Sequence, residues 1–353
     1  MRCRIVRLLA FLFSLLLISG PATAAERLQT AWIGEHESFL VWYAKQKGWG
    51  FKGWDKEVGL DLRMLRFGSG EKIVSTQKQY EWSIAGCGAV PMLMSAMKGQ
   101  FYVIGVGNDE SDTTAIYVRP DSPVLTKQGA NGLYPKVHGD AKAVRGSIVL
   151  CPQGTAAHYL LDTWLHILGL TEKDVTFKDV LPGPAVDMFS KDFGDAISIW
   201  APSTYAADRK GYKVAALSSD CGARQPILLL ADRAFADAHP EQVRAFLRMY
   251  LRVVDVMRKQ GVEAFVDDYV RFNKTWAQRP LSREEALEDL RIHPIFTLDE
   301  QLALFHPQAG RLRDWLRGII GFYGRLGTLS QQDILKLNEF GYLNDSFLKE
   351  LQY

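Results

Sequence analysis

Apolar stretches of strand length alternate with amphipathic stretches of helix length along most of this chain. In the middle of the chain, the pattern predicts strands at 144–151, 175–177 and 195–200, with a helix at 158–168 after the first of them. Pro202 follows the third strand and is well placed to start another helix. Strands and helices that alternate at these lengths predict a mainly parallel sheet flanked by helices.

The first part of the chain repeats this order of strand, glycine turn and helix. A long helix that begins at Pro240 and ends at Gly261 carries an apolar stripe at helical spacing, which indicates packing in the core. From Arg283 onward we expect a series of helices. The strands expected in this part are 28–33, 61–67, 82–85 and 102–106, with a return strand at 226–231.

The first 25 residues have the features of a cleaved signal peptide. A basic start precedes an apolar run, 8–18, and Ala22-Thr-Ala24 supplies the small residues of a cleavage site. The run is too short to span a membrane, which needs about 20 apolar residues. We therefore expect export to the periplasm and a mature chain that begins near residue 26.

Size and charge limit what the mature chain can be. The net charge is +2, and loss of Arg2, Arg4 and Arg7 brings it close to zero, which argues against a nucleic-acid-binding protein. A chain of this length exceeds one ordinary core, so we expect an α/β fold with two lobes. We expect the first lobe at 26–118 plus 223–353, including the C-terminal helices, and the second lobe at 119–222.

Three cysteines remain in the mature chain, Cys87, Cys151 and Cys221. An oxidising compartment permits one disulfide, and the Cys151–Cys221 pair is the candidate, although three free buried thiols fit the sequence as well. No cysteine lies in a spacing that is typical of a metal site, so we expect no metal and no cofactor.

Four motifs together resemble one known family. They are the helix start Gly154-Thr-Ala-Ala-His-Tyr-Leu-Leu161, the run Gly194-Asp-Ala-Ile-Ser-Ile-Trp-Ala-Pro202, the turn Gly86–Pro91 and the helix Ala238–Leu247. In order and spacing, the mature chain resembles the periplasmic substrate-binding proteins of ABC importers, in the group for nitrate, bicarbonate, sulfonates and taurine. Thiamine-precursor binders share this fold.

The resemblance implies two lobes that close on a solute like a hinge. It implies a monomer that delivers a small solute to a membrane permease and its ATPase, without catalysis. Enzymes also exist on this fold, but the sequence contains no cysteine-rich motif near a histidine and no Gly-x-Ser-x-Gly elbow. A periplasmic solute sensor remains a further alternative.

Ligands of such sheets bind beyond the carboxyl ends of the strands. The glycine turns at 68–70, 86–88 and 154–156 precede helices, whose first N–H groups are unpaired and carry partial positive charge. Such turns suit a sulfonate, carboxylate or nitrate group. The candidate ligand-binding residues are Gly34, Glu35, Gly70, Gly88, Asp112, Thr113, Gly154, Thr155, Ala156, His158 and Trp200.

Several of these residues also have a structural explanation. His158 can bond to a neighbouring carbonyl, and Trp200 can pack between the lobes. Glu35, Glu37 and Asp112 oppose an anion if they face the cleft. Carboxylates there favour an amine instead, as in an aminosulfonate or a basic pyrimidine. The sequence therefore leaves the charge of the solute open between an anion and a zwitterion.

Overall fold

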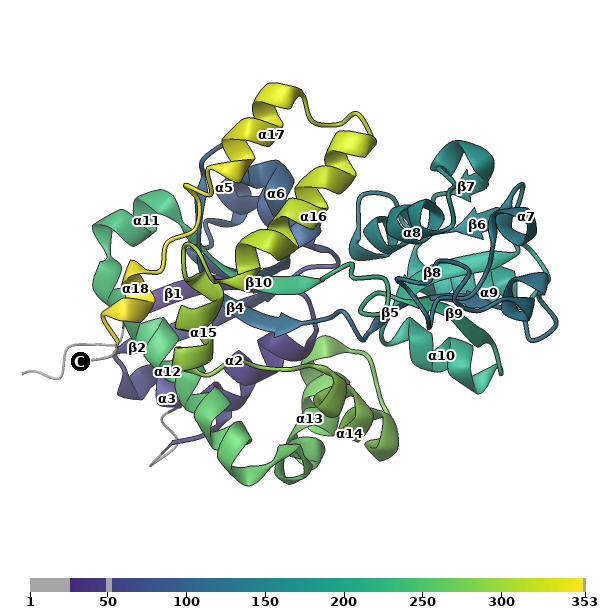
Figure 1. Cartoon of the computed structure of the whole chain (residues 1–353). Coiled ribbons are helices and arrows are strands. Elements are labelled where there is room, and N and C mark those ends of the chain that lie inside the picture. Colours follow the sequence, from purple (N-terminus) through teal and green to yellow (C-terminus); the bar gives the residue numbers. More distant parts are fainter. Residues whose placement is uncertain (1–25, 49–52, 352–353) are drawn as a thin grey trace, which may run out of the picture.

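The computed structural model describes residues 26–48 and 53–351. The expected signal peptide lies outside the described residues. The chain forms two sheets of five strands each, in the orders β2-β1-β3-β10-β4 and β7-β6-β8-β5-β9. We call the first sheet with its helices the first lobe, and the second sheet with its helices the second lobe; Figure 1 shows them side by side.

The strands of the first lobe are β1 (Glu26–Trp32), β2 (Leu60–Arg66), β3 (Ile84–Gly88), β4 (Phe101–Asp109) and β10 (Pro226–Asp232). Its helices up to residue 260 are α2 (His36–Gln46), α3 (Trp54–Glu57), α4 (Gly70–Ser75), α5 (Gln77–Tyr80), α6 (Ala89–Ala96), α11 (Arg233–Ala238) and α12 (Pro240–Gln260).

The strands of the second lobe are β5 (Thr114–Val118), β6 (Ile148–Leu150), β7 (Thr176–Lys178), β8 (Ala196–Trp200) and β9 (Lys213–Leu217). Its helices are η2 (Pro123–Thr126), α7 (Ala141–Val144), α8 (Ala156–Ile167), η3 (Glu172–Asp174), α9 (Pro182–Phe189) and α10 (Ser203–Arg209).

Both sheets are mixed, whereas the sequence predicted mainly parallel sheets. In each lobe two of the strand pairings are parallel and two are antiparallel. The antiparallel pairings all involve β10 in the first sheet and β5 in the second. These two strands each come directly after a crossing from the other lobe, so no helix connects them to a parallel neighbour in the same sheet.

The inner strands β5, β6 and β8 of the second lobe are buried on both faces, and alternate side chains pack against different helices. Ile116 and Val149 belong to the core under α8, whereas Leu150 and Ile197 pack with Phe189 of α9 on the opposite face. This alternation follows from the two-residue period of a strand. It fixes the register of β6 and β8, and therefore the position of the turns that follow them.

The chain crosses between the lobes twice, from β4 to β5 and from β9 to β10. Thr114–Val118 pairs with β8 and β9 in the second sheet, although the expected boundary after residue 118 would place it in the first lobe. The boundary prediction is wrong by one strand, because an apolar strand carries no local mark of which sheet it will join.

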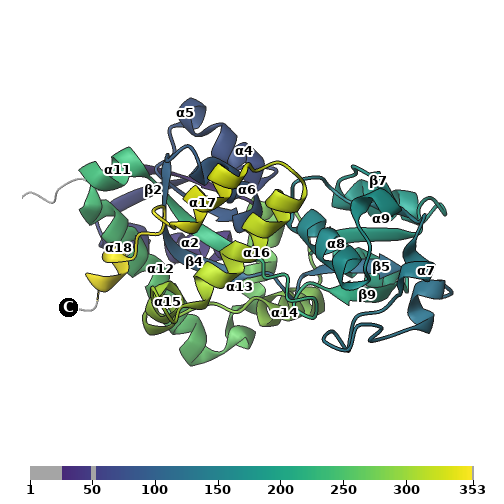
Figure 2. The same ribbon diagram turned by 45° about the horizontal axis from the view of Figure 1, so that its top comes forward.

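The C-terminal helices extend the first lobe and reach the second. They are η4 (Val262–Phe265), α13 (Val266–Phe272), the π-turn η5 (Asn273–Ala277), α14 (Arg283–Ile292), α15 (Leu298–Phe305), α16 (Arg311–Arg325), α17 (Gln331–Asn338) and α18 (Ser346–Lys349). Figure 2 shows α16 lying between α6 and α8. Arg325 at its end pairs with Asp162 of α8 at 2.5 Å, so this helix ties the two lobes together.

Most predicted elements are present within a few residues of their expected bounds. Residues 120–142, for which no strand or long helix was predicted, contain the short helix η2, the start of α7 and a bridge between Gln128 and His138. Within the ranges that the structure describes, no helix combines the length and apolar character of a membrane span.

The predicted disulfide is wrong, since Cys87, Cys151 and Cys221 are all free and buried. Cys151 follows β6 and Cys221 follows β9, and two strands, β8 and β5, separate β6 from β9. Strands lie about 4.8 Å apart, so the two cysteines are well beyond the reach of a disulfide. Burial raises the pKa of the Cys221 thiol to about 12, which makes it unreactive in the folded state.

We predict that the chain from residue 26 onward, unfolded in guanidinium without reductant, reacts with three equivalents of a thiol reagent. The folded protein should react far more slowly, because all three thiols are buried. A single reactive thiol after unfolding would show that a disulfide forms and would contradict the structure.

Candidate functional site

Three carboxylates lie close together where the two lobes meet. Glu35 precedes α2, Glu37 lies in the first turn of α2, and Glu110 follows β4 at the start of a crossing segment. One oxygen of each lies within 4.8 Å of the others. Their exposed fractions are only 8%, 1% and 7%. We call these residues the carboxylate cluster.

Two glycines make room for the cluster. A Cβ on Gly86 of β3 would lie 2.8 Å from Cγ of Glu37. A Cβ on Gly107 of β4 would lie 3.0 Å from Cβ of Glu37. A side chain at Gly86 would also collide with the ring of Trp32, at 2.6 Å. The sheet therefore has a gap in its side-chain layer, and Glu37 fills it.

The charge of the cluster is poorly compensated. Burial raises the pKa of Glu35, Glu37 and Glu110, and the neighbouring carboxylates raise the pKa of Glu37 and Glu110 further. Arg279 opposes this effect, but its Nη1 lies 3.5 Å from Oε1 of Glu35, at the limit of a hydrogen bond. A positively charged group placed among these oxygens would therefore be strongly favoured.

A stacked pair of histidines borders the cluster. The rings of His36 and His293 lie 4.9 Å apart and are nearly parallel. Nδ1 of His293 lies 2.6 Å from the carbonyl oxygen of Asp289, and its Nε2 lies 3.9 Å from Oε1 of Glu110. Burial and the second imidazole lower the pKa of His36, so its ring is neutral at neutral pH. A neutral imidazole can accept a hydrogen bond from a donor on the solute.

Asp289 of α14 connects the two lobes beside the cluster. Its carboxylate accepts hydrogen bonds from Tyr269 of the first lobe and from Tyr205 of α10 in the second lobe. Glu285, one turn earlier, pairs with Arg209 of α10. Polar contacts next to the carboxylate cluster thus join the two lobes.

Several buried polar atoms in this region have no hydrogen-bond partner among the described residues. Such groups are rare in proteins, because a buried polar atom without a hydrogen bond is costly. They include both ring nitrogens of His36, Oε2 of Glu37, both side-chain amide atoms of Asn108 and Nε of Arg279.

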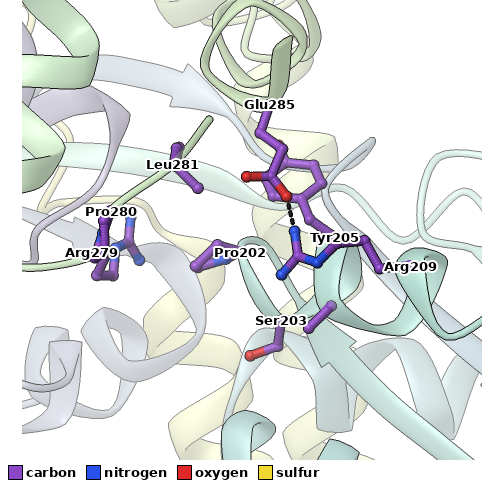
Figure 3. Close-up of a pocket in the computed structure, with 9 residues that line it drawn as sticks. Pro202, Ser203, Tyr205, Arg209, Arg279, Pro280, Leu281 and Glu285 are labelled. Carbon is purple, nitrogen blue, oxygen red and sulfur yellow. Dashed lines mark ion pairs between the residues drawn. The ribbon is translucent and has the colours of Figure 1, made fainter. Parts of the chain in front are cut away.

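Two cavities lie between the lobes. The inner one, of about 20 Å³, is lined by Glu110, by Gly88 and Val90 at the start of α6, and by Ala156 at the start of α8. The outer one, of about 240 Å³, lies between α10 and residues 279–285 (Figure 3). The inner cavity has room for about one water molecule, whereas the outer one is large enough for part of a small solute.

The cluster has the chemistry of a cation site. Carboxylate oxygens and a neutral imidazole accept hydrogen bonds from an ammonium group, and they are also ligands for divalent metal ions. Glu35, Glu37 and Glu110 are the described residues whose placement would suit a metal.

Comparisons with known proteins agree on the class of this chain. No family model matches it. It is 22% identical over 70% of its length to a putative ABC transporter periplasmic binding protein of Brachyspira hyodysenteriae, of which the match covers 70%. It is 24% identical over 81% of its length to a putative aliphatic sulfonates-binding protein of Bacillus subtilis, of which the match covers 83%.

The crystal structure of the periplasmic aliphatic sulphonate binding protein SsuA from Escherichia coli superposes with a TM-score of 0.68 at 17% identity, over 88% of this chain and 96% of that one. The chain has the fold of a periplasmic substrate-binding protein. The predicted fold class and the resemblance to the sulfonate group are thereby confirmed.

Four of the predicted ligand-binding residues lie at the cavities or the cluster. Gly88 and Ala156, from different lobes, line the inner cavity together with Glu110. Glu35 belongs to the cluster, and the side chain of Trp200 is among the groups that lower its pKa. For these residues, ligand contact remains a prediction that the geometry permits.

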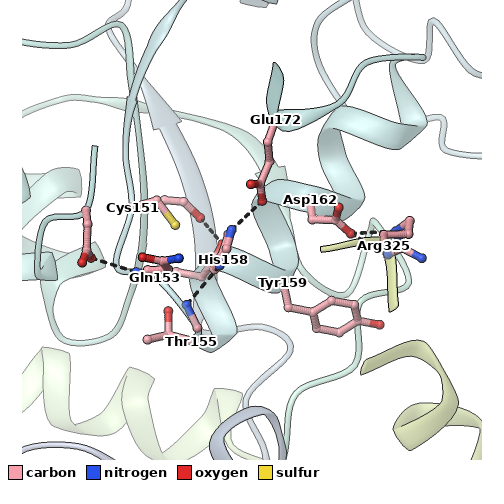
Figure 4. A network of polar contacts seen from close by, with 12 residues as sticks. Cys151, Gln153, Thr155, His158, Tyr159, Asp162, Glu172 and Arg325 are labelled. Atoms are coloured by element: carbon pink, nitrogen blue, oxygen red, sulfur yellow. Dashed lines mark hydrogen bonds and ion pairs between the residues drawn. The ribbon is translucent and has the colours of Figure 1, made fainter. Parts of the chain in front are cut away.

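The turn 153–158 is held by its own contacts (Figure 4). Nδ1 of His158 accepts a hydrogen bond from the backbone N–H of Gly154, and its Nε2 lies 2.5 Å from Glu172. The hydroxyl of Thr155 donates to the carbonyl of Pro152. The ring nitrogens of His158 and the hydroxyl of Thr155, expected to face a solute, are therefore engaged by Gly154, Glu172 and Pro152.

The other predicted residues have structural roles or are exposed. Gly34 packs against Ala277, and Gly70 packs against Cys87 and Pro91. These positions are followed by helices, but close packing already explains why they are glycine. The Thr113 hydroxyl donates to the carbonyl of Glu110, and Asp112 is exposed on the crossing segment.

The sequence prediction missed most of the polar side chains at this site. Glu110 lies in a polar run directly after the apolar strand β4. Its position at the carboxyl end of a strand could have marked it as a candidate ligand-binding residue. Arg279, Asp289 and His293 come from the C-terminal third, where only the helical pattern is visible. No local signal shows that this region folds back to the cleft.

We predict that Gly86→Ala destabilises the protein by about 1–3 kcal/mol, because the added methyl collides with Trp32 and Glu37. Gly88→Ala on the same strand is the matched control, since a Cβ there meets its nearest atom at 3.7 Å. Urea unfolding of both variants measures the difference. Equal stabilities would show that the strand does not approach Glu37 as closely as described.

Proposed function

We propose that this chain, a solute-binding component of an ABC import system, captures a small solute between its lobes and holds a positively charged group of that solute in the carboxylate cluster. The observation that carries this proposal is the placement of Glu35, Glu37 and Glu110 within 4.8 Å of one another in a buried site. A zwitterion or an amine therefore fits better than a free anion such as nitrate.

Electrostatics support this preference. Carboxylates in a site of low dielectric repel one another when they ionise, which raises the pKa of Glu37 and Glu110, and the described contacts supply one guanidinium, that of Arg279, at 3.5 Å. A free anion would add to the repulsion, whereas an ammonium group would relieve it and receive charge-assisted hydrogen bonds. The unpartnered Oε2 of Glu37 is available for one of these bonds.

Two helix starts lie at the inner cavity, which Glu110 of the cluster also lines. The helices α6 and α8 begin at the inner cavity, where their unpaired N–H groups carry partial positive charge. Negative charge on the carboxylates and partial positive charge on the helix starts are therefore found in the same region of the cleft. This charge distribution supports a zwitterionic solute such as an aminosulfonate or an amino acid.

Closure of the lobes would enclose the bound solute. Arg325–Asp162 and Arg209–Glu285 join the lobes on two sides of the cleft, and Tyr205–Asp289 joins them beside the cluster. In this proposal the protein acts in the periplasm, and its partners are a permease and an ATPase. The naming of the Brachyspira relative as an ABC transporter periplasmic binding protein supports this assignment.

We predict that solutes with an amine raise the melting temperature more than counterparts without it, because binding to the folded state stabilises it. Suitable pairs are taurine with ethanesulfonate, β-alanine with propionate, and ethylamine with ethanol. A thermal-shift assay compares the members of each pair at equal concentration.

The proposal is contradicted if no amine-bearing member stabilises the protein more than its counterpart. Stabilisation by nitrate or ethanesulfonate alone would support the hypothesis that the solute is a free anion. Stabilisation by a divalent metal ion, without any effect of amines, would assign the cluster to a metal instead.

We predict that Glu37→Gln weakens binding of ethylamine at least about tenfold, since it removes a charge-assisted hydrogen bond. The unliganded variant should melt at the same or a higher temperature, because burial and Glu35 raise the pKa of Glu37 and so favour a neutral side chain at this position, and glutamine is neutral. Isothermal titration and thermal unfolding measure the two effects. Glu339→Gln, at an exposed position directly after α17, is the control for charge.

A less stable Glu37→Gln variant that binds ethylamine as tightly as the wild type would indicate a structural role. The cluster would then have no part in recognising the solute.

A further inference from the structure

The outer cavity has a charge opposite to that of the carboxylate cluster. Its lining includes the guanidinium groups of Arg279 and Arg209, the carboxylate of Glu285 and the hydroxyl-bearing Ser203. Figure 3 shows Arg279 on one side of this cavity and the Arg209–Glu285 ion pair on the other. Because Glu285 is paired with Arg209, the remaining charge on the lining is that of Arg279.

Arg279 has hydrogen-bond donors that no described residue accepts. A guanidinium group has five N–H donors. Nη1 lies 3.5 Å from Glu35, and Nε is buried without a partner among the described residues. The side chain is still 26% exposed, and it lines the outer cavity. A planar guanidinium with free donors at the edge of a cavity is suited to a carboxylate or sulfonate group.

Arg279 borders the cluster and the outer cavity at the same time. Its contact with Glu35 places it at the cluster, and its place in the lining puts it at the cavity. An acidic group bound to Arg279 would therefore lie only a short distance from an amine bound to the cluster. This arrangement favours a solute in which few carbon atoms separate the amine from the acid.

We propose that Arg279 binds the acidic group of the solute in the outer cavity, so that the protein selects short-chain amino acids or aminosulfonates. This inference rests on the proposed function, because the amine of the same solute is held by the carboxylate cluster. The outer cavity has a volume of about 240 Å³, which leaves room for the acidic group and the carbon chain.

The test compares zwitterionic probes with a probe that has no acidic group. Taurine and β-alanine carry both groups, and ethylamine carries only the amine. Isothermal titration measures the affinity of each probe for the wild type, Arg279→Gln and Arg279→Lys. Arg258→Gln is the matched control, since Arg258 is an exposed arginine that pairs with Glu300 away from the cleft.

We expect Arg279→Gln to weaken binding of taurine or β-alanine at least about tenfold, because a hydrogen bond to a charged group is lost. Binding of ethylamine should stay the same or become tighter, because the positive charge of Arg279 no longer repels the amine. Arg279→Lys should weaken the zwitterions less, since it keeps the charge but loses the planar fork. Arg258→Gln should change neither.

Equal loss of affinity for zwitterions and for ethylamine would overturn the inference, because Arg279 would then act only through the shape of the site. It would also be overturned if ethylamine bound the wild type and neither taurine nor β-alanine did so more tightly, and this result would leave the proposed function intact. If none of the three amines bound the wild type, both the inference and the proposed function would be contradicted.

Discussion

The repulsion between three buried carboxylates is the constraint on which this site depends. Glu35, Glu37 and Glu110 are brought within 4.8 Å of one another by the start of α2 and the end of β4. Burial and mutual repulsion raise the pKa of Glu37 and Glu110. Such an arrangement is costly unless a positive charge joins it. In the proposed function, a bound cationic group would offset this cost.

The rest of the fold supports this arrangement. Gly86 and Gly107 leave space in the first sheet for Glu37. The C-terminal helices bring Asp289 and His293 to the same place and reach the second lobe through Arg325. A solute at the cluster would therefore contact the elements that hold the lobes together, which links recognition to closure.

The sequence predicted most of the fold because strands and helices are encoded locally. The turn at 153–158 and the end of β8 were correctly placed at the carboxyl ends of strands. The pairing of Thr114–Val118 and the separation of Cys151 from Cys221 were not predicted, because they depend on strand order in the sheet. Strand order is set by contacts between distant segments.

The site was predicted only in part, for the same physical reason. The acidic turn with Glu35 and Glu37 was recognised as unfavourable for an anion, and the structure gives that turn its partner, Glu110. The ring of His158 was expected to face a solute, but its Nδ1 accepts a hydrogen bond from Gly154 and its Nε2 contacts Glu172. Arg279 reaches Glu35 from 244 residues away, and no local pattern shows such a contact.

A crystal structure of the protein with the amine that stabilises it most would test the central claim most directly. The account predicts closed lobes and a solute nitrogen within hydrogen-bond distance of at least two of the three carboxylates. A solute that turns an acidic group toward the cluster, or that binds outside the cleft, would contradict it.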